Sequence, residues 1–132
     1  MKYPRGPAAV AAVLALFGMT AAPVRADIKD YEFQLVQNEA RKGEAVIAVR
    51  LVNKKTGKAV PDAVIAAKRI DMAPDGMADM APRIEQMSST EPGVYRFKAN
   101  LSMEGRWQLS LGAKVQGETG TVESRLVIKA TP

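Results

Sequence analysis

The sequence predicts an all-β sandwich of about seven short strands, preceded by a secretory signal peptide. Apolar and polar residues alternate with a period of two over most of residues 31–129, which is typical of strands that bury one face. Clusters of Gly, Pro and Asp separate these segments at short intervals. No helical periodicity continues beyond the N-terminal 26 residues.

The N-terminal 26 residues have the pattern of a signal peptide. Two basic residues precede an uncharged run over residues 7–22, and Val24 and Ala26 place small residues where a signal peptidase acts. The run is short for a membrane span, so we expect cleavage after Ala26, with an uncleaved anchor as the alternative. The expectation is a periplasmic chain that begins at Asp27, forms one domain over 27–132 and has no stable membrane insertion after cleavage.

The charge balance gives no support to a nucleic-acid partner. The signal segment holds three of the 19 Lys and Arg residues and no acid, which leaves 16 basic against 14 acidic residues. These basic residues are scattered and form no stripe with aromatic residues, so no nucleic-acid binding is expected. The chain has no cysteine, and stability must therefore come from the core without disulfides.

The first half of the domain is predicted to contain three strands. Residues 31–37 alternate cleanly, and residues 45–53 are apolar on both faces, with Arg50 marking the outer one. After a polar turn that contains Gly and Pro, residues 63–72 form a third strand whose facing is ambiguous. The side chains expected to face inward from the first two are Tyr31, Phe33, Leu35, Ile47, Val49 and Leu51.

The second half is predicted to contain three clear strands and a short extra one. The clear strands cover residues 93–101, 106–115 and 121–129, and a short strand is compatible with residues 83–88. The turn "QGETG" joins the last two as a hairpin. The side chains expected to face inward are Tyr95, Phe97, Ala99, Leu101, Trp107, Leu109, Leu111, Ala113, Val115, Val122, Leu126 and Ile128.

Strands with one polar face are stable when two sheets pack together, so the expected architecture is an immunoglobulin-like β-sandwich. The stretch "EPGVYRF" places Tyr95 directly after a turn with Pro and Gly. Such a tyrosine either bonds through its hydroxyl to nearby backbone, as in a tyrosine corner, or simply fills the core.

Catalysis has little chemistry available. The chain has no His and no Cys, which removes the usual general base near neutral pH and the thiolate nucleophile. None of its five serines lies in a nucleophile-elbow sequence. We therefore expect a protein that is not an enzyme.

The stretch "MAPDGMADM" at residues 72–80 is the strongest candidate for a functional site. It has the turn residues of a loop, yet it holds three methionines, and two more follow in the chain. Asp71, Asp75 and Asp79 lack the alternating ligand spacing of a calcium loop, and Asp75 before Gly76 is ordinary turn chemistry. The candidate metal residues are Met72, Met77, Met80, Met87 and Met103.

Three interpretations of these methionines remain open. In the first, the loop and Met103 converge on one Cu(I) or Ag(I) ion, because thioethers are soft, uncharged ligands that suit these ions. In the second, the loop caps the core, because methionine fills irregular gaps well. Exposed methionines can finally form an adaptable contact surface for a partner protein.

Four segments resemble the YtkA-like and FixH-like periplasmic domain families. These segments are "GKAVPDAVI", "MAPDGMADM", "PGVY" and the hairpin "MEGRW", in the same order as in those families. Met72, Met77 and Met80 match the methionine segment and Tyr95 the corner, and the hairpin matches at Met103, Gly105 and Trp107. The resemblance covers about residues 31–129.

The resemblance implies an immunoglobulin-like sandwich outside the cytoplasm. Members with such a methionine segment are often associated with heavy-metal or copper efflux, and FixH-like members with copper delivery to, or assembly of, a cytochrome oxidase. A cleavable N-terminal segment departs from the anchored FixH type and favours a soluble periplasmic role. The expected function is Cu(I) or Ag(I) handling, with a metal-free module docking on an efflux or oxidase-assembly protein as the alternative.

Overall fold

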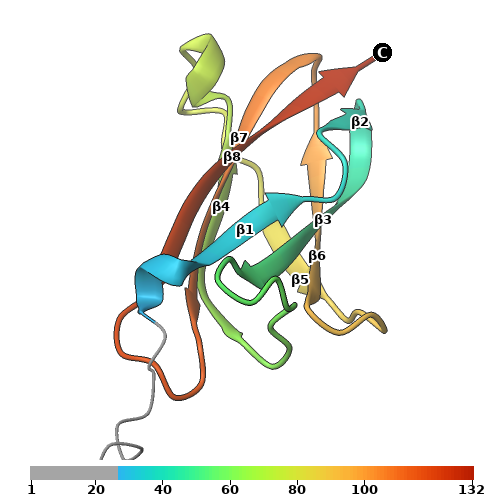
Figure 1. The fold of residues 1–132 in the computed structure, drawn as a ribbon. Helices are drawn as coiled ribbons and strands as arrows, with labels where there is room; N and C mark the ends of the chain where they lie inside the picture. The colour runs from blue at the N-terminus through green and yellow to red at the C-terminus, as the bar shows by residue number, and fades with distance from the viewer. Residues whose placement is uncertain (1–26) are drawn as a thin grey trace, which may run out of the picture.

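The computed structural model describes residues 27–132, which fold into two four-stranded β-sheets packed face to face (Figure 1). One sheet has the strand order β1-β3-β6-β5 and the other β2-β8-β7-β4. Two short 3-10 turns, η1 (Ile28–Asp30) and η2 (Ala73–Asp75), precede β1 and follow β4. The strands are β1 (Tyr31–Leu35), β2 (Glu39–Arg41), β3 (Gly43–Asn53), β4 (Val64–Asp71), β5 (Ile84–Met87), β6 (Val94–Leu101), β7 (Gly105–Lys114) and β8 (Val122–Thr131).

The strand order confirms the predicted immunoglobulin-like sandwich. The order β1-β3-β6-β5 corresponds to the A-B-E-D sheet of immunoglobulin domains, and β8-β7-β4 corresponds to their G-F-C sheet. The eighth strand, β2, was not predicted. It pairs in parallel with the end of β8, from Glu39 opposite Lys129 to Arg41 opposite Thr131, and so extends the second sheet by one strand.

The core lies between the sheets and consists largely of the predicted inward side chains. All nine of those predicted on β6 and on the β7 segment are buried, and Trp107 and Phe97 are fully enclosed at 0 % exposure. The inward set of β3 is also confirmed. Toward the ends of the sandwich the match is weaker, because Tyr31, Leu35 and Leu126 are only partly buried.

A β-bulge explains why the facing of β4 was ambiguous from the sequence. Ile65 pairs with Ala113 and Ala67 with Gly112, so the register shifts by one residue between them. Beyond the shift, Lys68 lies opposite the buried Leu111 and therefore occupies an inward position at the edge of the sheet. The extra residue breaks the period of two on which the sequence argument depended.

The predicted signal peptide, residues 1–26, lies outside the described residues and stays a prediction. Within residues 27–132, no helix is long and apolar enough to cross a membrane.

Candidate functional site

Three methionines converge where β4 ends. The Met72 amide donates a hydrogen bond to the Met80 carbonyl (3.2 Å), and the Met72 carbonyl accepts one from the Met77 amide (3.0 Å). A further bond joins the Met80 amide to the Met77 carbonyl (3.0 Å). The segment 72–80, called the methionine loop below, is thus closed on itself at its three methionines.

Turn chemistry produces this closure. The Asp71 carboxylate accepts a hydrogen bond from the Ala73 amide (2.9 Å), which starts η2. Pro74 lies within η2, and Gly76 ends it with a left-handed φ of 76°, a conformation that glycine adopts without steric cost. The sequence prediction of a turn here is confirmed, and its effect is to return the chain so that Met77 lies beside Met72.

The start of β7, which follows the hairpin turn that carries Met103, packs against η2 of this loop (Figure 1, top). A Cβ atom added to Gly105 would lie 2.6 Å from the Met72 methyl carbon and 2.6 Å from Asp75 Oδ2. The absence of a side chain at Gly105 therefore lets the methionine loop settle onto the start of β7. Trp107 Nε1 donates to the Met103 carbonyl (3.1 Å) and ties the hairpin to the core.

The four methionines at this end differ in exposure. Met72 is fully buried and belongs to the core, whereas Met77 and Met80 are partly buried and pack against it. Met103 is 38 % exposed. The thioether-bearing residues therefore range from the core to the surface at one end of the sandwich.

Met87 lies apart from the other four. It ends β5 and pairs with Arg96, whereas Met103 follows Leu101 at the far end of β6. Arg96 and Leu101 are separated along the strand by about 16 Å at the ordinary rise per residue. Met87 instead lines an open depression with Pro61 and Tyr95 at the opposite end of the molecule.

Two arginines that the sequence analysis did not single out bind the aspartates of the loop. Arg69 Nε lies 2.8 Å from Asp71 Oδ2, and its Nη2 donates to the Ala78 carbonyl (3.0 Å). Arg106 donates from its amide (2.7 Å) and its Nε (2.8 Å) to the two oxygens of Asp75. The ion pair between Arg69 and Asp71 could have been predicted from the sequence, because residues i and i+2 of a strand share one face.

These ion pairs offset the negative charge of two aspartates beside the methionine loop. The Arg106 amide and then its guanidinium hold the pKa of Asp75 below its ordinary value. Asp71 and Asp75 are already neutralised by arginines, so they are not free to offset the charge of a bound cation. Among the described residues, no group of three or more His, Cys, Asp or Glu side chains is placed to hold a metal ion.

The other two recognised segments meet at the opposite end of the sandwich. The Tyr95 hydroxyl donates to the Val60 carbonyl (2.7 Å) and accepts from the Ala63 amide (2.9 Å). A Cβ atom on Gly93 would lie 2.5 Å from that of Ala59, so the "PGVY" turn is pressed against the "GKAVPDAVI" segment. Burial raises the pKa of Tyr95, although the bond from Ala63 opposes the rise.

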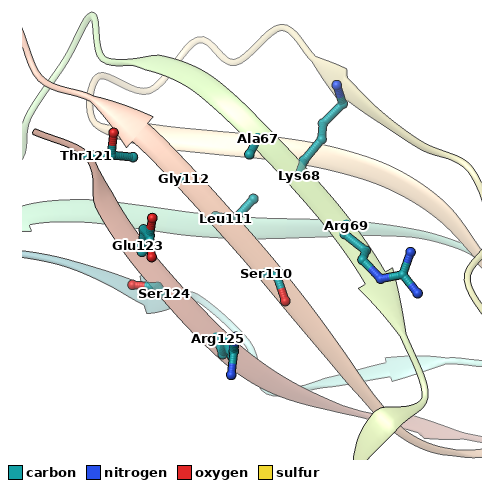
Figure 2. A pocket seen from close by; sticks show the side chains of 10 residues that line it. All are labelled: Ala67, Lys68, Arg69, Ser110, Leu111, Gly112, Thr121, Glu123, Ser124 and Arg125. Carbon is teal, nitrogen blue, oxygen red and sulfur yellow. The ribbon is translucent and has the colours of Figure 1, made fainter. Parts of the chain in front are cut away.

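A shallow groove of about 690 Å³ crosses the outer face of β4, β7 and β8. Figure 2 shows Ser110 and Gly112 along β7, with Lys68 and Arg69 extending from β4 on one side and Arg125 from β8 on the other. Lys68 and Arg69 extend away from the groove, and the small residues Ala67, Ser110 and Gly112 lie between β4 and β8. Arg69 links it to the methionine loop through the Ala78 carbonyl.

Comparison with known proteins gives a family and a distant structural neighbour. The YtkA-like family model matches residues 25–112, which include both segment pairs described above. No curated protein matches the chain. Among solved structures, the chain is similar to the Lin-41 filamin domain, with 18 % identity, a TM-score of 0.45 and coverage of 83 % of this chain and 98 % of that one.

Proposed function

Because the chain belongs to the YtkA-like family, with residues 25–112 matched, we propose that it is a periplasmic metal-handling protein and not an enzyme. It binds a soft monovalent ion, Cu(I) or Ag(I), at the methionine end of the sandwich. The observation that supports this most directly is the closure of the methionine loop, in which the backbone of Met72 bonds to both Met77 and Met80. The role belongs to heavy-metal or copper efflux, as the resemblance of the methionine segment implies.

The donor set suits such an ion. Thioether sulfur binds Cu(I) and Ag(I) well and hard or borderline divalent cations poorly. The chain offers no thiol and no imidazole that would compete for the ion. Asp71 and Asp75 are paired with arginines, which leaves Asp79 as the one aspartate of this segment whose charge no described arginine offsets, too little for a site built for a divalent cation.

The order of exposure suggests how the ion enters. Met103 is the most exposed of the four methionines, Met77 and Met80 are intermediate, and Met72 is enclosed. We propose Met77, Met80 and Met103 as the ligands that an ion meets from solvent, with Met72 as the innermost one. Met87 is left out of this set because it lies at the other end of the sandwich.

The test replaces Met77, Met80 and Met103 together by Leu. This change keeps size and apolarity and removes the sulfurs, so the variant should fold with a loss below about 1.5 kcal/mol per site. Its affinity for Ag(I), measured by calorimetric titration, should fall by about a hundredfold or more. Binding by the parent should be nearly constant from about pH 5 to pH 8, since a thioether has no proton to lose.

Met87→Leu is the matched control, because it removes one sulfur outside the proposed site. It should bind Ag(I) like the parent. Parental affinity in the triple variant would show that the loop methionines serve packing or docking. Absence of Ag(I) and Cu(I) binding by the parent itself would refute metal handling.

The second candidate function is a metal-free docking module, and the complete burial of Met72 favours it. In this case the methionine loop caps the core, and the exposed Met103 contacts a partner such as an efflux or oxidase-assembly protein. The groove on β4, β7 and β8 would extend that contact, because Arg69 joins it to the loop. A partner that binds parent and triple Leu variant without any added ion would support this function.

A further inference from the structure

The Asp75 carboxylate joins the methionine loop to the strand that follows Met103. Its Oδ2 accepts from the Arg106 amide (2.7 Å), and its Oδ1 accepts from Arg106 Nε (2.8 Å). Arg106 Nη2 donates in addition to the Pro74 carbonyl (2.7 Å). Three hydrogen bonds therefore cross between η2 and the start of β7, and two of them come from one guanidinium.

Trp107, the residue after Arg106 in β7, holds the hairpin that carries Met103. Trp107 is fully buried, and its Nε1 donates to the Met103 carbonyl (3.1 Å). Arg106 and Trp107 are consecutive in a strand, so their side chains leave on opposite faces. Arg106 thereby holds the methionine loop while Trp107 holds the Met103 hairpin, and Gly105 provides the space in which the two parts meet.

We propose that the Asp75–Arg106 pair is a clamp that positions the methionine loop against the Met103 hairpin, so that thioethers from both segments reach one ion. This inference rests on the proposed metal-binding function. Asp75 and Arg106 act through the methionines and are positioning residues. A guanidinium is suited to this role because its planar set of donors reaches the Asp75 carboxylate from Nε and the Pro74 carbonyl from Nη2 at the same time.

Charge variants separate positioning from simple electrostatics. Asp75→Asn removes a negative charge near the ion, so both explanations predict weaker binding. Arg106→Gln removes the positive charge beside Asp75 and keeps only the bond that the amide of residue 106 donates to this carboxylate. An electrostatic role predicts tighter binding of the cation by this variant, whereas a positioning role predicts weaker binding.

The experiment measures by calorimetric titration the Ag(I) affinity of the parent, of three single variants and of the Asp75→Asn/Arg106→Gln double variant. Asp75→Asn and Arg106→Gln should each weaken binding by about tenfold. The double variant should be no weaker than either single one, because the two residues act as one unit. Asp79→Asn is the matched control: this aspartate lies in the same loop and makes no side-chain hydrogen bond among residues 27–132, and its replacement should change affinity by less than about twofold.

A second readout keeps the clamp testable without metal. In the metal-free protein, nuclear Overhauser contacts between the Met72 methyl and Gly105 protons should weaken in Asp75→Asn and Arg106→Gln and persist in Asp79→Asn. Parental or tighter Ag(I) binding by Arg106→Gln, or unchanged contacts in both clamp variants, would overturn the clamp. Absence of Ag(I) binding by the parent would instead refute the proposed function, while these contacts would still report on the clamp.

Discussion

The Tyr95 hydroxyl both donates and accepts a hydrogen bond, and both partners are backbone groups of the loop between β3 and β4. The sequence left two roles open for this residue, a corner hydroxyl or a core ring. The structure combines them, because the residue is only 8 % exposed and its ring meets Phe33 edge to face. The position differs from the tyrosine corner of antibody domains, which lies near the start of the F strand, whereas Tyr95 is the second residue of β6, the strand that corresponds to E.

Replacing Tyr95 by Phe should destabilise the protein by about 1–3 kcal/mol, since the Val60 carbonyl and the Ala63 amide would lose their partner in a poorly solvated position. Urea denaturation measures the loss. Tyr31→Phe is the control, because its hydroxyl binds the Glu118 side chain in a more exposed place and should cost less. Equal losses of unfolding free energy in both variants would show that the hydrogen bonds of Tyr95 stabilise the protein no more than the exposed bond of Tyr31 does.

The bond between Asp75 and Arg106 should depend on pH in a predictable way. Its pKa is held below the ordinary value by Arg106, so its contribution to stability is fully present above the pKa of the unfolded chain and is lost as pH falls through the folded pKa. The Arg106 amide resonance should therefore be unchanged from about pH 8 to pH 5 and should shift only below about pH 4. A midpoint at or above the ordinary aspartate value would contradict this assignment.

At the scale of elements, the strands with a regular period were predictable and the irregular ones were not. Strands β6 and β7 follow strict alternation, and their inward residues could be assigned one by one. Strand β2 has only three residues and pairs with a segment some 90 positions away, so nothing local marks it. The bulge in β4 likewise depends on pairing with β7.

In the candidate site, too, the local features could be predicted from the sequence and the long-range contacts could not. The sequence identified the methionines and the turn around Gly76, because turn chemistry is local. It did not separate Met87 from the others, since only the register of β5 against β6 sets that distance. The partnership of Asp75 with Arg106 was also hidden, because it joins residues 31 positions apart through the packing of η2 on β7.

Gly105→Ala tests the contact between these two elements. Gly105 has a φ of 139°, and a methyl group there would strike both the Met72 methyl carbon and the Asp75 carboxylate. Neither group can move freely, because Met72 is fully buried and Asp75 is held by Arg106. The backbone conformation alone should cost about 1–3 kcal/mol, and the collision should add to it.

Gly43→Ala is the control for backbone strain. Gly43 has a φ of 111°, and a Cβ atom there would meet nothing within 4 Å. The difference in unfolding free energy between the two variants therefore measures the collision. If both variants lose the same stability, the methionine loop does not pack against Gly105 as tightly as the structure indicates.

On the scale of the whole molecule, the recognised segments form two contacts at opposite ends of the sandwich. The "PGVY" turn meets the "GKAVPDAVI" segment at one end, through Tyr95 and Gly93. The methionine loop meets the "MEGRW" hairpin at the other, through Asp75 and Gly105. Because the described domain has no disulfide, the rigid core between these ends is what fixes their geometry.

The edges of the sandwich must also resist pairing with other chains. β4 is an edge strand of eight residues, long enough to offer its free backbone groups to a second molecule. Two features oppose this: the bulge between Ile65 and Ala67, and Lys68, which takes an inward register position opposite Leu111 yet stays exposed. A charge that must remain solvated at an inward position disfavours any strand that would cover it.

Replacing Lys68 by Val should therefore increase self-association. The change removes the solvated charge, leaves an apolar residue of high β-propensity at the open side of the sandwich, and takes nothing from the core. Light scattering during size-exclusion chromatography at rising concentration should give a larger mean mass for the variant than for the parent. Lys114→Val is the matched control, since this exposed lysine lies on β7, an interior strand of the sheet whose backbone is already paired on both sides along most of its length. Equal association of both variants would attribute the effect to surface hydrophobicity, whereas association confined to Lys68→Val would show that one inward charge keeps the β4 edge from pairing.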